Sequence, residues 1–333
     1  MLVAYCVADG AEAAVVGPGY ALSQTVMGGA PAHDALGADE QLWTAWSLDP
    51  FVLIPAGLLA LLYVRGLRRW RGGRAESHRW WQTACFFLGL GTIVLALVSP
   101  LDRLTEHHFS MHMVQHLLLI AVGVPLLLVG APTTPVLRGL PRWARRLAAR
   151  PLAPHGRASI VWRALTQPLV ALLLANATLI AWHLVPGWYD AAVRDDGIHA
   201  LEHGTFIATA LLFWWNVIDP RPLHAPLGYL GRMGYVLVNG TIQSVLATLI
   251  TLADYTLYPV YEDVRLILPI GPRADQELGG LIMWIPGQAL NLTVLAALFG
   301  VWAMRSELAQ QEADRRALAE PPRAAPPAPS TLD

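Results

Sequence analysis

The stretch "HHFSMHMVQHLLLIAVGVPLLLVG", residues 107–130, decides how the rest of the sequence is interpreted. Its second half is apolar, and the stretch is long enough for a helix that crosses a bilayer. Its first half carries four histidines and two methionines within ten positions. Side chains of types that bind metals therefore lie at the start of a segment that is typical of a membrane span.

The composition of the whole chain is that of a membrane protein. Hydrophobic residues make up 55% of the 333 positions and charged residues only 14%, whereas soluble domains carry about 25% charge. The mean hydropathy is +0.43. Basic residues form no stripe outside short loops, which argues against a nucleic-acid partner and leaves membrane lipid as the expected surroundings. Two distant cysteines, Cys6 and Cys85, provide no disulfide framework.

Seven apolar stretches have the length of a membrane span. We therefore expect an all-α membrane protein, a bundle of seven transmembrane helices within residues 43–304. Residues 1–42 are expected to be a disordered or leader-like extension. Residues 305–333 are expected to be a cytoplasmic tail, mostly disordered after a short amphipathic helix. The seven expected cores are 48–65, 81–99, 109–130, 167–185, 200–218, 233–254 and 280–303.

The arginines predict how this bundle is oriented. Arginine supplies all 23 basic residues, and 19 of them fall in alternate loops and in the C-terminal tail. Loops rich in positive charge stay in the cytoplasm. We therefore predict an outer N-terminus and a cytoplasmic C-terminus. The four arginines left on the outer side are Arg103, Arg194, Arg265 and Arg273.

Seven of the eleven histidines map to the outer half of this topology. Three on the third span are spaced by four residues, so they share one helix face and descend by about 12 Å. Two on the fifth span repeat that spacing, and one ends the fourth span. A lone histidine at such a place is more often structural, but ionisable groups gathered within a membrane indicate function. The predicted metal ligands are His108, His112, His116, His183, His199 and His203.

Methionine and acidic side chains on the outer half could complete such a site. Met113 and Met283 would suit copper, above all Cu(I), because a thioether is a soft ligand. Methionines in apolar helices nevertheless serve packing in most cases. Asp102, Glu202 and Asp275 could each orient an imidazole from behind or face water.

Three other interpretations of the histidines stay open. A b-type haem protein would use a facing pair such as His112 and His203 as axial ligands. The stretch "HALEH", residues 199–203, matches the H-x-x-E-H pattern of inverted zinc proteases, with Glu202 as the general base. A zinc-dependent membrane hydrolase of the ceramidase type would use a serine, an aspartate and histidines at one face. The residues available for that role are Ser110, Asp102, His112 and His203.

Four blocks of the sequence together resemble one known family. They are "SPLDRLTEHHFSMHMVQHLLLIAVGVPLLLVGAP", "WHLVPGWYDAAV", "HALEHGTFIATALLFWW" and "DQELGGLIMWIPG". In this order and spacing they resemble the caa3-type cytochrome c oxidase assembly factor family, of the kind with several membrane spans. The similarity runs from about residue 43 to residue 304, which covers nearly all of the predicted membrane domain.

The resemblance implies a bacterial inner-membrane protein that matures a haem–copper oxidase. It would help copper to reach the CuB centre and would contact oxidase subunit I or other assembly factors. No nucleophile in the sequence stands clearly paired with a base, so we expect an assembly factor rather than an enzyme. Copper is the expected metal, with zinc or haem b as the alternatives. The family's histidine motifs fall on His112, His116, His183, His199 and His203, and its acidic positions on Asp102 and Asp275.

Overall fold

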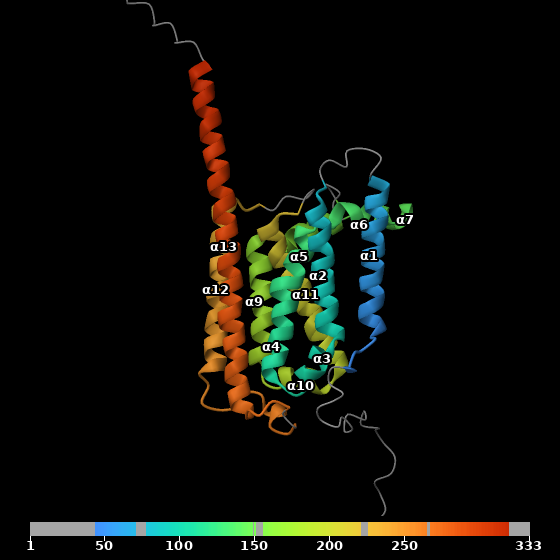
Figure 1. Cartoon of the computed structure of the whole chain (residues 1–333), viewed down its shortest axis with the longest axis vertical. Helices are drawn as coiled ribbons and strands as arrows, with labels where there is room; N and C mark the ends of the chain where they lie inside the picture. The colour runs from blue at the N-terminus through green and yellow to red at the C-terminus, as the bar shows by residue number, and fades with distance from the viewer. Residues whose placement is uncertain are drawn as a thin grey trace, which may run out of the picture.

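The computed structural model describes residues 44–70, 78–148, 150, 156–220, 226–264 and 267–319, and no strand occurs among them. Each of the seven expected cores falls on helix (Figure 1). Six of them correspond to α1 (Pro50–Trp70), α2 (Trp80–Val98), α9 (Pro168–Leu184), α11 (Asp196–Ile218), α12 (Tyr229–Thr251) and α13 (Pro272–Ala319). The third core is built from α4 (Phe109–Leu117), the π-helix η3 (Leu118–Gly123) and α5 (Val124–Val129).

The helices that meet the length and hydropathy of a membrane span are fewer than the seven expected from the sequence pattern. Five helices are long and apolar enough to cross a membrane, and a sixth span results if α9 is joined to α8 (Arg157–Leu165), which is bent from it by 65°. The helix α11 is outside this set because histidine and acidic residues lower the hydropathy of its first turns. The all-helical membrane architecture is therefore confirmed, and seven crossings stay a prediction.

Two predicted regions lie partly or wholly outside the described residues. The N-terminal extension, residues 1–42, is outside them, as are residues 320–333 of the predicted tail. The short amphipathic helix expected after the last span is the continuation of α13, which runs without a break to Ala319. Figure 1 shows this helix extending well beyond the rest of the bundle.

Short helices cover both ends of the bundle. The helices α3 (Pro100–Thr105) and α10 (Trp188–Arg194) lie at the end where α4 begins, which we call the histidine end (Figure 1). The helices α6 (Thr133–Gly139) and α7 (Arg142–Ala148) lie at the opposite, arginine end. The first turn of α3 is fixed by Ser99, whose side chain accepts a hydrogen bond from the Leu101 amide.

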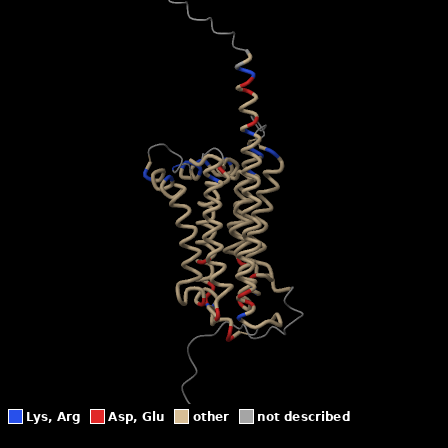
Figure 2. The backbone as a smooth tube through the Cα atoms, turned by 90° about the vertical axis from the view of Figure 1, so that its left-hand side faces the viewer, with Lys and Arg blue, Asp and Glu red and all other residues tan. Residues whose placement is uncertain are grey.

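Charges divide between the two ends. Figure 2 shows most arginine positions gathered at the arginine end and on the projecting part of α13. Most acidic positions within the bundle lie toward the histidine end (Figure 2). This separation is the one that the positive-inside argument requires. It leaves the assignment of the arginine end to the cytoplasm as a prediction.

Glycines bring the third span close to α2. A Cβ atom added to Gly89 would collide with backbone atoms of Leu127 and Gly123. Small residues permit such close approach of helix backbones in membrane proteins. The π-helical turn η3 lies at this contact, and such turns often occur next to functional sites. The close packing fixes η3 and α5 against α2, and α4, which carries His112 and His116, is continuous with η3.

Candidate metal centre

Three helices bring histidines together at the histidine end. His112 and His116 lie one turn apart on α4, with ring centroids separated by 4.3 Å. His203 on α11 faces both of them, at 5.8 Å from His112 and 5.3 Å from His116. The predicted shared face of α4 and the i, i+4 pair on α11 therefore point toward one another. All three rings are buried.

A carboxylate lies among these rings. Glu202 is 0% exposed. One of its oxygens lies 3.6 Å from His112 Nε2 and the other lies 3.7 Å from His116 Nε2. One atom from each of His112, His116, Glu202 and His203 can be chosen so that all four lie within 4.8 Å of one another. We call these four residues the histidine–glutamate cluster.

The cluster has the lone pairs that a cation needs. Both carboxylate oxygens of Glu202, both ring nitrogens of His116 and Nε2 of His203 have no hydrogen-bond partner among the described residues. Buried polar atoms nearly always have a partner, so several unpartnered polar atoms in one place call for an explanation. A neutral imidazole offers one lone pair and a carboxylate offers several. Three imidazoles and a carboxylate are a ligand set that suits zinc or copper. The residues present therefore fit a transition-metal ion.

Two further predicted ligands flank the cluster. His199 on α11 lies with its Nε2 atom 3.2 Å from Nε2 of His112. His183 at the end of α9 has its ring centroid 5.9 Å from that of His116. Its Nδ1 atom is 2.8 Å from the Leu179 carbonyl, and its Nε2 atom has no partner among the described residues. Both rings lie beside the four clustered residues and could add further nitrogen ligands to them.

His108 has a different position from the one its spacing predicts. It is the N-cap of α4 in an extended conformation, so it does not continue the face of His112 and His116. Its Nε2 atom accepts hydrogen bonds from the Ile267 and Leu268 amides. Its Nδ1 atom lies 3.4 Å from a carboxylate oxygen of Asp275. The ring is occupied by these partners and stands apart from the cluster.

The predicted acidic residues lie in three different settings. Asp275 on α13 accepts hydrogen bonds from the amides of Phe109 and Ser110 and from the Ser110 hydroxyl. Asp102 on α3 accepts one bond from the Gln115 side chain at 2.7 Å. Burial raises the pKa of Asp102 to about 6, with the Gln115 hydrogen bond acting in the opposite direction. Glu202, which we expected to orient an imidazole, lies among the ring nitrogens themselves.

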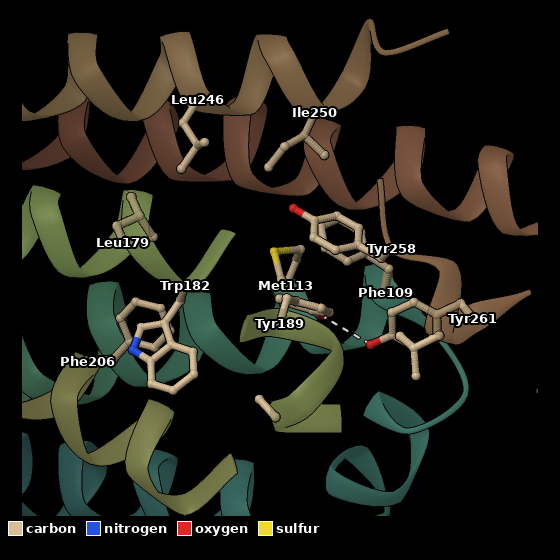
Figure 3. Close-up of a cluster of buried hydrophobic side chains, with 12 residues drawn as sticks. Phe109, Met113, Leu179, Trp182, Tyr189, Phe206, Leu246, Ile250, Tyr258 and Tyr261 are labelled. Atoms are coloured by element: carbon tan, nitrogen blue, oxygen red, sulfur yellow. Dashed lines mark hydrogen bonds between the residues drawn. The ribbon is translucent and has the colours of Figure 1, made fainter. Parts of the chain in front are cut away.

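The predicted methionines line a cavity beside the cluster. The cavity has a volume of about 80 Å³ and extends from His116 and His183 toward Asn239. Met113 and Met283 both border it. Met113 is also packed in the core that contains Phe109 (Figure 3). Met283 packs against the same core, so the structure places both sulfur-bearing side chains near the histidines and gives both a packing role.

Two tyrosines at the histidine end had no signal in the sequence pattern. Tyr189 on α10 lies with its hydroxyl 2.6 Å from Nδ1 of His112. Tyr261, in the short helix η5 (Pro259–Tyr261), lies 3.2 Å from the Tyr189 hydroxyl (Figure 3). Both belong to connections whose tertiary position no periodicity predicts.

These features define a class of protein: a multi-helix membrane protein with a buried histidine–glutamate cluster near one end of the bundle. The sequence places the chain more narrowly. The family described as cytochrome c oxidase caa3 assembly factor matches residues 61–305, and the chain belongs to this family. The resemblance seen in its four sequence blocks is thereby confirmed.

The chain is also similar to three curated mycobacterial proteins, each described as uncharacterized. It is 28% identical over 291 residues to one from Mycobacterium bovis and, equally, to one from Mycobacterium tuberculosis. It is 26% identical over 294 residues to one from Mycobacterium leprae. These matches cover 82–83% of this chain and 42% of each relative, so the chain spans less than half the length of those proteins. No solved structure matches the chain.

Proposed function

We propose that this protein is an integral membrane assembly factor for a haem–copper cytochrome c oxidase, and that it handles copper as cargo. The ion would be taken up by the histidine–glutamate cluster and passed toward the CuB centre of the oxidase. The proposed partners are oxidase subunit I or other assembly factors. The proposed location is the bacterial inner membrane, with the cluster near the outer face.

One observation carries the metal part of this proposal. The cluster unites three buried imidazoles and a buried carboxylate whose lone pairs have no partner among the described residues. Family membership supports the oxidase part. Met113 and Met283 beside His116 and His183 favour copper over zinc, because zinc gains nothing from a thioether.

The position of the cluster fits a handling role. The cluster includes two residues near the start of α4, at the histidine end of the bundle and opposite the arginine-bearing helices α6 and α7 (Figure 1). The positive-inside rule assigns the histidine end to the outer side. Copper destined for an outer-facing oxidase centre would reach it there without crossing the membrane. More imidazoles surround the cluster than a single four-coordinate ion needs, and such excess supports ligand exchange rather than permanent binding.

Contacts and distances at this end argue against two of the alternatives, the zinc-dependent membrane hydrolase and the haem protein. The hydrolase interpretation needs Ser110 and Asp102 beside the metal, but Ser110 donates its hydroxyl proton to Asp275 and Asp102 is bonded to Gln115. A porphyrin between His112 and His203 would need a slot of several hundred Å³. The ring centroids of these two histidines are 5.8 Å apart, and the neighbouring cavity, which borders His116 and His183, has only about 80 Å³.

The deciding experiment is metal analysis of the purified protein together with its optical spectrum. We expect stoichiometric copper and no Soret band. The double variant His112→Ala/His116→Ala should lose the copper, whereas His78→Ala should retain it, because His78 pairs with Tyr63 and Thr83 away from the cluster. Stoichiometric zinc without copper, or a Soret band, would overturn the proposal.

A deletion strain tests the oxidase link. Under copper limitation it should make oxidase subunits and insert haem, but the CuB centre should be copper-deficient and activity low. Added copper should restore part of the activity by mass action, and added zinc should not. The double variant should behave like the deletion at normal membrane levels. A fully copper-loaded, fully active oxidase in the deletion strain would contradict the assembly function.

A further inference from the structure

A chain of hydrogen bonds connects the histidine–glutamate cluster with the short helix α3 at the histidine end. It begins at His112 Nδ1, which lies 2.6 Å from the Tyr189 hydroxyl. The Tyr189 hydroxyl lies 3.2 Å from that of Tyr261, as the dashed line in Figure 3 marks. The Tyr261 hydroxyl donates to the Thr105 carbonyl at 2.9 Å. All four residues are buried, with at most 2% of each exposed.

Counting protons along this chain leaves one arrangement that satisfies every contact. The Thr105 carbonyl can only accept, so the single hydroxyl proton of Tyr261 is used there. The contact between the tyrosines then requires Tyr189 to donate to Tyr261. Tyr189 has no second proton, so its contact with His112 requires the ring to donate from Nδ1. A neutral imidazole with a proton on Nδ1 carries its lone pair on Nε2.

We propose that Tyr189 and Tyr261 are positioning residues that fix the tautomer of His112 and keep its Nε2 lone pair available to a metal ion. This proposal rests on the proposed metal site for its purpose but not for its geometry. Nε2 is the atom that faces the cluster, 3.6 Å from a Glu202 oxygen and 3.2 Å from Nε2 of His199. With the proton of His112 on Nδ1, His199 is the donor in that second contact, and a bound ion would replace this hydrogen bond. In the opposite tautomer the chain would have two protons for three contacts, and Nε2 would present a proton to the ion.

His183 has the same tautomer, fixed by a single hydrogen bond to a backbone carbonyl. Its Nδ1 atom lies 2.8 Å from the Leu179 carbonyl, which can only accept, so this ring also carries its proton on Nδ1. Its Nε2 atom is left without a partner among the described residues. Histidines that bind metals commonly donate their other ring nitrogen to such an acceptor. His112 reaches its final acceptor, the Thr105 carbonyl, through two tyrosines.

The variant Tyr261→Phe tests the chain at a residue that does not touch the cluster. Without the Tyr261 hydroxyl, the proton of Tyr189 is free to be donated to His112 Nδ1, and the ring can shift its own proton to Nε2. Tyr258→Phe is the matched control, because Tyr258 is equally buried in the same core but donates to the His183 carbonyl instead. Tyr189→Phe removes the middle of the chain while leaving Tyr261 bonded to Thr105, so it serves if Tyr261→Phe does not fold.

The measurement is the nitrogen-15 spectrum of the metal-free protein labelled at histidine, with the His112 signals assigned by their loss in His112→Asn. We expect a protonated Nδ1 and an unprotonated Nε2 in the wild type and in Tyr258→Phe. Tyr261→Phe and Tyr189→Phe should lose this single tautomer. Copper affinity should fall by about 10- to 100-fold in these two variants and stay unchanged in Tyr258→Phe.

The two readouts separate this inference from the proposed function. A wild-type His112 protonated on Nε2, or a tautomer unaffected by Tyr261→Phe and Tyr189→Phe, overturns the inference even if copper binds. The predicted tautomer and its loss in the variants support the inference even if the purified wild-type protein binds no copper, in which case the proposed function fails alone.

Discussion

Two carboxylates at the histidine end, Asp275 and Glu202, are equally buried but differ in their hydrogen-bond partners. Asp275 is surrounded by donors: two backbone amides, the Ser110 hydroxyl and the nearby ring of His108. Glu202 has imidazole nitrogens at 3.6 and 3.7 Å and no hydrogen-bond partner among the described residues. Both are 0% exposed.

The difference is the one we expect between a structural site and a binding site. A buried charge that is fully hydrogen-bonded holds elements together, here α13 and the start of α4. A buried carboxylate without partners destabilises the fold unless something else supplies them. A protein keeps such a group when a ligand completes it. The residue types are the same in both places, so only the partners distinguish their roles.

The first test asks whether both carboxylates lie near the outer face at all. A reporter active only outside the cytoplasm should work when fused near Asp102 or Asp190 and fail when fused near Arg145 or at the C-terminus. The expected signal is all or nothing, because the positive loops hold the arginine end inside. The reverse pattern would place the whole cluster on the cytoplasmic side and break the proposed copper route.

The second test removes the unpartnered carboxylate or a ring beside it. Glu202→Gln and His116→Ala should each lower metal affinity by more than about 100-fold, beyond what loss of an orienting partner costs. Thermal unfolding should change little, because neither side chain has a hydrogen bond to lose. Combining His112→Ala or His203→Ala with His116→Ala should add little, since ligands of one ion act as a unit. Equal, additive losses would instead indicate loose surface binding.

The third test removes the partnered carboxylate. Asp275→Ala should lower the free energy of unfolding by about 3–5 kcal/mol, because it leaves several buried donors without an acceptor. Ser110→Ala, which deletes one of those donors, should cost only about 1 kcal/mol. Chemical unfolding in detergent measures both. Metal bound per folded molecule should stay normal in each variant; a specific loss of metal would show that Asp275 serves the cluster after all.

The sequence predicted the elements of this site better than their contacts. The four-residue spacing on α4 and on α11 predicted two facing histidine pairs, and the structure brings His112, His116 and His203 together. The spacing failed for His108 because the helix begins only at Phe109. An argument from periodicity holds only within a continuous helix, and periodicity does not indicate the residue at which the helix begins.

Residues in connections were beyond the reach of the sequence pattern. Tyr189 and Tyr261 contact His112 and each other through tertiary packing of α10 and η5, and no spacing along the chain relates them. Glu202 was expected behind an imidazole, since an acidic residue next to a histidine has no preferred role by sequence alone. Its lack of hydrogen-bond partners, which distinguishes it from Asp275, is a property of the folded structure only.

The fourth test concerns Asp102, which lies between the two extremes with one donor, Gln115. Burial raises its pKa from 3.8 to about 6, so the folded state favours the protonated form. The folded protein therefore loses up to about 3 kcal/mol of stability as the pH rises from about 4 to 6, where the charge must be buried. Asp102→Asn keeps an oxygen for Gln115 and removes the titration, so its unfolding free energy should lack this decline. A wild type that gains stability over this range would contradict the assignment.

The smallest effect is expected at the methionines, where binding and packing compete. Met113 and Met283 border the cavity next to His116, and a thioether favours Cu(I) but adds nothing for Zn²⁺. Met113→Leu/Met283→Leu should therefore lower the affinity for Cu(I) by less than about tenfold, because the imidazoles and Glu202 remain, and leave that for Zn²⁺ unchanged. Exchange of methionine for leucine conserves volume and costs less than about 1.5 kcal/mol each, so the fold should survive.

Met111→Leu is the control for this pair, since Met111 lies on the same helix as Met113 but does not border the cavity. Competition with a Cu(I) chelator of known affinity measures the change. A selective loss of affinity for Cu(I) would extend the binding site from Glu202 to the wall of the cavity. It would also explain why two methionines border that cavity. Equal weakening of both metals would mean that the leucines disturb the packing around His116, and no change would leave the methionines with packing alone. Either of these two results would confine the binding site to nitrogen and oxygen ligands, and the preference for copper would then have to come from the partner that receives the ion.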